Sequence, residues 1–274
     1  MMKWLKRLIL YPILFIIVLV TLVGIFYNPA NATLKGMYGS QLLWYGYEEK
    51  GNDMTEAFLA LPLYQNAQNY RAQSVQNTKI GNYDEAIRYL DKAAELDPMN
   101  VDGYYGWVLL DYYRDYDKAL FHLERLDSAT DFVDYVSDYN ILYAKALCYK
   151  QKREYDRAID LFEQSINYEI EHHSEDWVTH QMYFQTGRTL QLMGRSKEAI
   201  GYYNKAIVNW NGSSESIYYK GLAEIELGLP DGCDNLKIAL EKVKKGIKSS
   251  DMYVERFDEI YEGQVEKSIV ELCE

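Results

Sequence analysis

The 274-residue sequence lacks the short motifs that identify most enzymes. It contains no GxxxxGK[ST] phosphate loop, no HExxH helix, no GxSxG turn, no CxxC pair and no glycine-rich dinucleotide fingerprint. Each of these motifs holds a nucleophile, a metal ligand or a phosphate group at a fixed spacing. We therefore predict that the protein is not an enzyme and that it uses no cofactor.

Basic residues are scarce relative to acidic ones. The chain has 29 Lys and Arg against 41 Asp and Glu, a formal charge of −12. Nucleic-acid binding depends on clustered Lys and Arg that displace counterions, and the only such cluster is at the extreme N-terminus. This balance argues against nucleic acid as a partner and against attraction of the soluble part to an anionic membrane surface.

One long apolar run does occur, from Leu8 to Tyr27, and it carries no charge. About 20 residues at roughly 1.5 Å each span the hydrocarbon core of a bilayer. Lys3, Lys6 and Arg7 precede the run, and acidic residues follow it. The positive-inside rule then leaves the N-terminus in the cytoplasm. We predict a single-pass transmembrane anchor within residues 1–28, with the rest of the chain exported to a periplasmic or extracellular space.

A cleaved signal peptide is the competing interpretation of this segment. Ala30-Asn31-Ala32 has the A-x-A form of a cleavage site. The apolar run is longer than the usual 7–15 residues of a signal peptide, which favours the anchor. Both interpretations export the domain, and they differ only in whether the mature chain begins at Thr33.

The remainder of the chain is built from an internal repeat. Residues 81–98, GNYDEAIRYLDKAAELDP, place small and apolar residues on one helical face after a Gly-Asn turn. The pattern recurs four times, with an amphipathic stretch before each copy. The key small residues lie at intervals of 33, 39, 41 and 33 residues; they are Ala86, Ala119, Ala158, Ala199 and Gly232.

A second set of small residues lies in the middle of the preceding stretches, at Ser74, Ala146, Gly187 and Gly221, where it lets two helices approach closely. In the second copy Val108 occupies this place. Together these features resemble the tetratricopeptide repeat (TPR). The resemblance implies an all-α fold, a right-handed α-α superhelix of about five repeats over residues 67–248. We expect a helical connector at 33–66 and a C-terminal capping helix at 249–274.

In TPR solenoids the first helices line a concave groove, and the second, fifth, ninth and twelfth residues of each repeat usually face it. Carried onto this sequence, the resemblance implies a partner-binding groove that holds an extended peptide or a helix. Packing between neighbouring helices is the alternative role for the same side chains. The candidate groove residues are Arg71, Tyr105, Leu109, Tyr143, Leu147, Phe184, Arg188 and Tyr218.

Two longer loops are further candidates. Residues 127–138 carry Phe132 and Tyr135, and insertions in solenoids often contact partners. Residues 169–180 contain His172, His173 and His180 among acidic residues, which leaves a metal-binding enzyme or sensor as an alternative function. Because the histidine spacing matches no known site, we predict no metal. A structural homo-oligomer, in which tyrosine-rich faces pair, is another alternative.

Three cysteines are present. Cys148 lies on the inner face of an expected helix, where it acts as a small hydrophobe. Cys233 opens the last repeat helix and Cys273 ends the cap. If these two helices run antiparallel, the two thiols are neighbours, and an exported location permits a disulfide between them.

The sequence thus predicts a membrane-anchored, non-catalytic scaffold for a protein or peptide partner of unspecified identity.

Overall fold

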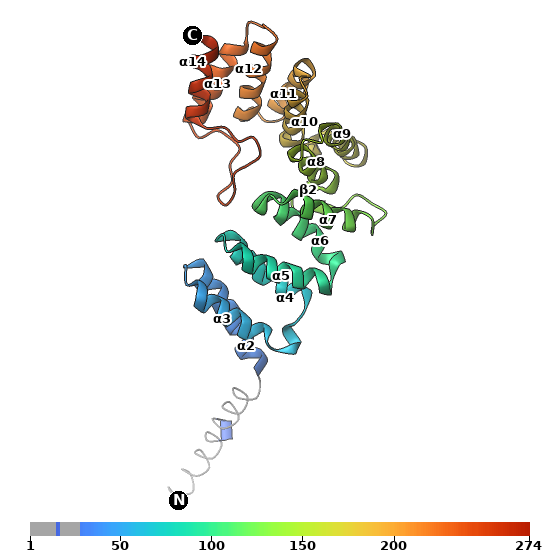
Figure 1. Ribbon diagram of the computed structural model, residues 1–274, viewed down its shortest axis with the longest axis vertical. Helices are drawn as coiled ribbons and strands as arrows, with labels where there is room; N and C mark the ends of the chain where they lie inside the picture. Colours follow the sequence, from blue (N-terminus) through green and yellow to red (C-terminus); the bar gives the residue numbers. More distant parts are fainter. Residues whose placement is uncertain (1–14, 17–27) are drawn as a thin grey trace, which may run out of the picture. The chain divides into compact units, whose positions relative to one another are not determined.

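The computed structural model describes residues 15–16 and 28–274 (Figure 1). The predicted membrane anchor, residues 8–27, lies outside the described residues except for Phe15 and Ile16. Among the helices that are described, none combines the length and the apolar character needed to cross a bilayer. The chain divides after Val101 into two compact units, each of which has its own internal packing.

The first unit contains two helical pairs, α2 with α3 and α4 with α5. A Cβ atom on Gly39 would lie 2.8 Å from the backbone oxygen of Gly51, so the first pair approaches backbone to backbone. Phe58, Leu59 and Tyr89 form the core of this unit. The helices are α2 (Asn28–Trp44), α3 (Glu48–Leu59), η1 (Pro62–Tyr64), α4 (Ala67–Lys79) and α5 (Tyr83–Leu96).

The second unit is a stack of helices in which each packs against its neighbours in the chain. One short antiparallel hairpin interrupts it, with Val136 paired to Tyr139. The elements are α6 (Pro98–Val108, which begins in the first unit), η2 (Leu109–Tyr113), α7 (Tyr116–Asp127), β1 (Tyr135–Val136), β2 (Tyr139–Asn140), α8 (Ile141–Gln151), α9 (Tyr155–His172), η3 (Glu175–Trp177), α10 (His180–Leu192), α11 (Ser196–Asn209), α12 (Ser214–Glu226), α13 (Gly232–Lys244) and α14 (Glu262–Cys273).

The predicted small residues are where the helices of each pair meet. Ala86, Ala119, Ala158 and Ala199 lie on the second helices and have no exposed surface. Gly187 faces the Tyr203 ring, and Gly221 faces the backbone oxygen of Gly232. A larger side chain at any of these sites separates the two helices, so the repeat interval read from the sequence is a packing constraint.

The turn between the two helices of a pair has the same left-handed backbone in every repeat. Gly81, Gly194 and Gly228 have φ of 81°, 77° and 68°. Arg114 and Arg153 occupy this turn in the second and third repeats with φ of 57° and 65°. Left-handed backbone favours glycine, and the two arginines adopt it although they carry a Cβ atom.

The second repeat corrects one expectation. Val108 is buried, but the close approach to α7 occurs at Gly106, where a Cβ atom would lie 2.8 Å from the Leu123 side chain. The helix then passes into the π-helical turn η2. A π turn absorbs an inserted residue, so the residues before it are shifted relative to the other repeats. Sequence spacing therefore put the close approach of the two helices at Val108, whereas it occurs at Gly106.

The C-terminal cap is shorter than predicted. Its helix α14 begins at Glu262 and packs against α13, and the Cys233 and Cys273 sulfur atoms are bonded with Cα atoms 5.8 Å apart. Residues 245–261 form neither helix nor strand. This segment, called the strap below, is the open loop between α13 and α14 in Figure 1.

We predict opposite effects for two glycine-to-alanine changes in the second unit. Gly221→Ala brings a methyl group against the Gly232 backbone oxygen, 2.8 Å away, and lowers the free energy of unfolding by about 1–3 kcal/mol. Gly201→Ala, in the middle of α11 with no atom within 4 Å, raises it by up to about 1 kcal/mol through helix propensity. Urea unfolding measures both. Equal effects of the two changes would contradict the close approach.

Candidate functional site

The strap lies across the first helices of successive repeats in the second unit. Gln185 of α10 donates from Nε2 to the backbone oxygen of Phe257 at 3.0 Å. Glu215 of α12 accepts from the backbone nitrogen of Ser249 at 2.9 Å, and Arg114, just after η2, donates to the Glu255 backbone oxygen. Side chains from three repeats thus hold the backbone of one irregular segment.

A buried ion cluster forms the centre of this contact. Asp258 of the strap pairs with Lys150 of α8 and with Arg188 of α10, whose Nε lies 3.1 Å from Oδ1. Lys150 is almost fully buried and also donates to the Gln185 side chain. Burial opposes the charge of Asp258, but Lys150 and Arg188 outweigh it and lower the pKa of Asp258. The carboxylate therefore stays ionised and pairs with two cations of the repeats.

Phe257 and Ile260 supply the apolar part of the strap. The Phe257 ring lies under the Arg114 guanidinium, 3.9 Å from the ring centre, and faces Tyr116. Ile260 is completely buried. The strap thus combines an aromatic residue, an aspartate and an aliphatic residue within four positions of the sequence.

The beginning of the strap rests on an unusual carboxyl group. Glu215 is 1 % exposed, and its Oε2 atom has no hydrogen-bond partner within the described residues. Burial raises the pKa of Glu215 to about 7, against hydrogen bonds from its own and the Ser249 backbone, with smaller effects from Lys248 and Glu259. The charge of Glu215 therefore changes near neutral pH.

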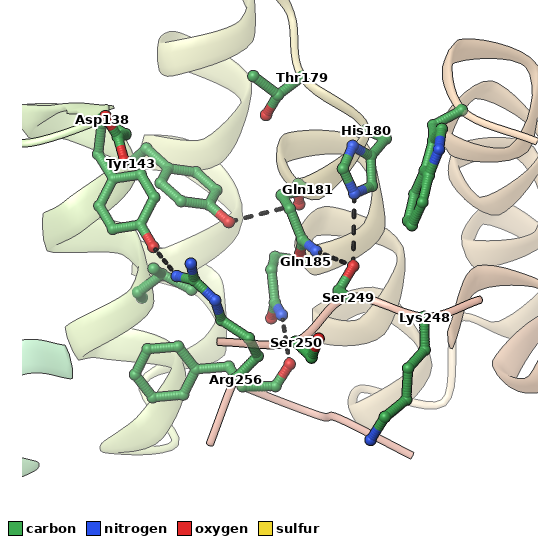
Figure 2. Close-up of a pocket in the computed structure, with 14 residues that line it drawn as sticks. Asp138, Tyr143, Thr179, His180, Gln181, Gln185, Lys248, Ser249, Ser250 and Arg256 are labelled. Carbon is green, nitrogen blue, oxygen red and sulfur yellow. Dashed lines mark hydrogen bonds between the residues drawn. The ribbon is translucent and has the colours of Figure 1, made fainter. Parts of the chain in front are cut away.

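A cavity of about 480 Å³ lies between the strap and helices α8 and α10 (Figure 2). Tyr139, Tyr143 and Trp210 give it aromatic walls, while Gln181, Ser249 and His180 bring hydrogen-bonding groups together at one side. Gln181 donates to Ser249 Oγ at 2.7 Å. The cavity is amphipathic, a property of sites that bind peptide side chains or small ligands.

The two cations of this cavity, Arg256 and Lys248, already have partners. Arg256 lies 3.1 Å from Asp251 and 3.3 Å from the Tyr139 hydroxyl, and Lys248 pairs with Glu259. Burial lowers the pKa of His180 to about 4, so its imidazole is neutral at pH 7. Apart from these paired cations and the exposed Asp138 carboxylate, the polar groups of the cavity are amides, hydroxyls and a neutral imidazole.

Most of the predicted groove residues are buried in the structure. Tyr105, Leu109 and Phe184 are at most 1 % exposed. These three side chains pack between helices, which is the alternative role that the sequence left open. For Tyr105 and Leu109 the shift in register caused by the π turn η2 explains why they are buried. Tyr218 is also buried and donates or accepts a 2.8 Å hydrogen bond with Ser268 of α14.

The other candidates lie apart from one another. Tyr143 and Leu147 line the cavity, and Arg188 binds the strap. Arg71 belongs to the first unit, beside Asp97 and Asn100 in a separate hollow. Phe132 is exposed on the loop before the hairpin. Tyr135 is exposed in strand β1, and its hydroxyl donates to Glu169 at 2.8 Å.

Several residues of the site were missed by the sequence analysis. Gln181 and Glu215 each lie six residues before the mid-helix glycine of their repeat, and Lys150 lies four residues after Ala146. These are the second and twelfth residues of TPR repeats, whereas only the fifth and ninth were carried onto the sequence. The signal was present in the repeat register, but a polar residue at the second or twelfth place does not stand out in an aromatic-rich chain.

The three histidines do not form a metal site in the structure. His172 stacks on Tyr168, His173 stacks on Trp177, and His180 faces Trp210. Among the described residues no three His, Cys, Asp or Glu side chains are placed to share a metal ion. The interpretation as a metal-dependent sensor therefore has no geometric support in this loop.

We predict that Glu215→Gln changes how stability depends on pH. Because the folded-state pKa of Glu215 is raised from 4.5 to about 7, its contribution to stability is complete below pH 4.5 and is lost as the pH rises towards 7. Glutamine cannot ionise, so the difference in unfolding free energy between variant and wild type shifts in favour of the variant by roughly 2–4 kcal/mol over that range.

Urea unfolding of both proteins from pH 4.5 to pH 8 measures this shift. His180, whose lowered pKa gives the opposite pH dependence between pH 6.5 and 4, is common to both proteins and cancels in the difference. A difference that does not change with pH would show that Glu215 ionises normally.

Comparison with known proteins identifies the repeat. Family models described as tetratricopeptide repeat match residues 77–100, 141–173 and 180–207. These stretches cover α8 with α9, α10 with most of α11, and α5 with its preceding turn. No curated protein matches the chain by sequence.

Solved structures share the arrangement of helices at low sequence identity. PilW, described as a widely conserved type IV pilus biogenesis factor, has 12 % identity and a TM-score of 0.57, over 80 % of this chain and 95 % of that one. PilF of Pseudomonas aeruginosa has 16 % identity and a TM-score of 0.54, over 80 % and 92 %. MamA has 23 % identity and a TM-score of 0.52, over 63 % and 95 %. The chain therefore contains tetratricopeptide repeats and has an all-α, solenoid-like fold.

Proposed function

We propose that this protein is a non-catalytic scaffold that binds an extended segment of a protein partner on the first helices of its repeats. The observation that carries the proposal is the binding of the strap. Gln185, Glu215 and Arg114 bind its backbone rather than only its side chains. Backbone recognition combined with side-chain pockets is the usual way in which a folded surface binds an extended peptide.

The fold supports the same function. TPR repeats present successive first helices at a regular spacing, and the structural relatives PilW, PilF and MamA share this architecture. Insertions between repeats add exposed aromatic residues beside the cavity, among them Tyr135 and Trp177 at 46 % and 56 % exposure. A partner that reaches the cavity meets these side chains first.

We further propose that residues 8–27 anchor the chain as a single transmembrane helix and that the repeats face a non-cytoplasmic space, such as the periplasm. The uncharged length of the segment and the basic residues before it support this arrangement. The Cys233–Cys273 bond is consistent with an oxidising compartment.

A site-specific crosslinker is expected to trap a partner at the cavity. A photoreactive residue in place of Asp138, which is exposed and lines the cavity, should give a discrete crosslinked protein in intact cells. The same residue in place of Val208, 87 % exposed on α11, is the matched control and should not. Mass spectrometry identifies the product. Identical products from both positions, or none from Asp138, would contradict binding at this face.

Membrane anchoring has its own test. The full chain should remain in the membrane pellet after an alkaline carbonate wash, because about 20 apolar residues partition into the bilayer. A variant that lacks residues 1–28 should be released into the supernatant. External protease should degrade the repeats of the full chain in intact spheroplasts. A mature N-terminus at Thr33 would show a cleaved signal instead, and protection from protease would show a cytoplasmic domain.

A further inference from the structure

The strap has the properties of a bound ligand rather than of a structural connection. Its backbone is held at Ser249, Glu255 and Phe257 by side chains from α12, α10 and the turn after η2. Between these points the strap forms no helix or strand of its own. The strap has bends and turns with hydrogen bonds of its own, such as those from the Tyr253 and Arg256 backbone nitrogens to strap carboxylates. Its backbone is nevertheless held on the repeats by side chains of other elements, in the way that a separate peptide is bound.

The ends of the strap are fixed independently of its middle. Helix α14 packs on α13, the Cys233–Cys273 bond joins the two helices, and Ser268 of α14 forms a hydrogen bond with Tyr218 of α12. The strap can therefore lift away while α13 and α14 stay in place. Segments with few buried apolar contacts open at a lower free energy than the core, and Ile260 is the one hydrophobic side chain of the strap that is fully buried.

The surface beneath the strap requires an anion. Lys150 and Arg188 both face Asp258, and burial lowers the pKa of Lys150 while Asp258 opposes that effect. Removing one member of such a buried pair leaves an uncompensated charge, which is strongly unfavourable. When the strap leaves, another carboxylate must take the place of Asp258 for the cations to remain stable in this position.

An aromatic site lies next to this anion site. The Arg114 guanidinium covers the Phe257 ring and Tyr116 faces it, so the two neighbouring strap residues fill two neighbouring sites. A flat aromatic ring under a guanidinium is a favourable contact. The surface therefore selects an aromatic residue followed directly by an acidic residue, in a turn where Asp258 has a left-handed backbone with φ of 56°.

We propose that the strap is an intramolecular occupant of the partner-binding surface, and that the natural partner displaces it with a segment in which an aromatic residue precedes an aspartate or glutamate. This inference rests on the proposed function and specifies its partner. Because both ends of the strap are tethered, its effective concentration is high. A partner in solution binds the closed protein weakly and binds it more tightly when the strap is loosened.

The experiment uses the full chain in mild detergent and a fluorescent peptide with the sequence of residues 249–261, SSDMYVERFDEIY. Fluorescence anisotropy should show at least tenfold tighter binding to the Phe257→Ala chain than to wild type, because that change loosens the strap and leaves the ion cluster intact. Asp258→Asn in the chain should have the same effect. Glu266→Gln is the matched control and should leave binding unchanged, because Glu266 of α14 forms an exposed pair with Lys244 of α13.

The peptide and the surface are varied in turn. Changing the peptide's own aspartate that corresponds to Asp258 to asparagine should reduce binding to the Phe257→Ala chain at least tenfold. Arg188→Gln combined with Phe257→Ala should reduce it similarly. Circular dichroism establishes that each variant is folded. If the Asp258→Asn chain does not fold, the comparison of wild type with the Phe257→Ala chain still tests whether the strap competes with the peptide.

Equal binding to wild type and to the Phe257→Ala chain would overturn the proposal, and so would binding that ignores the peptide's aspartate. The crosslinking experiment at Asp138 separates this result from the proposed function. Suppose that a partner is trapped at Asp138 but that loosening the strap does not change peptide binding. The scaffold function would then stand, and only the displacement of the strap by an aromatic–acidic segment would be refuted.

Discussion

The structure depends on the fact that no helical pair of this chain can bury its apolar face alone. Within each unit the pairs stack on one another, and the two helices of a pair are brought close by residues without bulky side chains, such as Ala158, Ala199 and Gly221. Stacking brings α8, α10 and α12 side by side. Polar residues that are far apart in the sequence, Lys150 and Glu215 among them, are thereby directed at one continuous surface within the second unit.

That surface contains buried charge, and this determines how it can be used. Two cations, Lys150 and Arg188, meet a single carboxylate, Asp258. Charges removed from water are stable only when they are paired. An acidic group at this place is therefore a requirement of the repeats themselves, and the strap is the part of the chain that meets it. Because the chain as a whole is acidic, a buried pair of cations distinguishes this surface from the rest of the protein and favours an acidic ligand group there.

The sequence predicted the repeat better than it predicted the site. Alternating small residues and turn glycines are local signals, and the family models match three of the repeats that these signals indicated. The register of the second repeat was wrong because a π turn at Leu109–Tyr113 absorbs an extra residue, which residue spacing does not reveal. Tyr105 and Leu109 were consequently placed in the groove although they belong to the core.

The prediction of a capping helix at residues 249–274 was partly wrong for a different reason. Phe257, Ile260 and Val265 are spaced like one face of a helix, and residues 249–274 were predicted to be helical on that basis. In the structure only α14 is helical, and the earlier apolar residues bind the repeats from an extended segment. Helical periodicity identifies residues that are buried on one side, but a segment whose side chains match a nearby surface can be buried there without forming a helix.

The sequence by itself determined the helical pairs, their order and the small residues at which they meet, because these depend on contacts between residues close in the chain. It also placed Cys233 and Cys273 near the ends of two neighbouring helices. Only the tertiary structure decided which side chains face the strap, since Asp258 reaches Lys150 across 108 positions of sequence and through the stacking of other repeats. Contacts of that kind follow from the relative placement of helices, which no local pattern encodes.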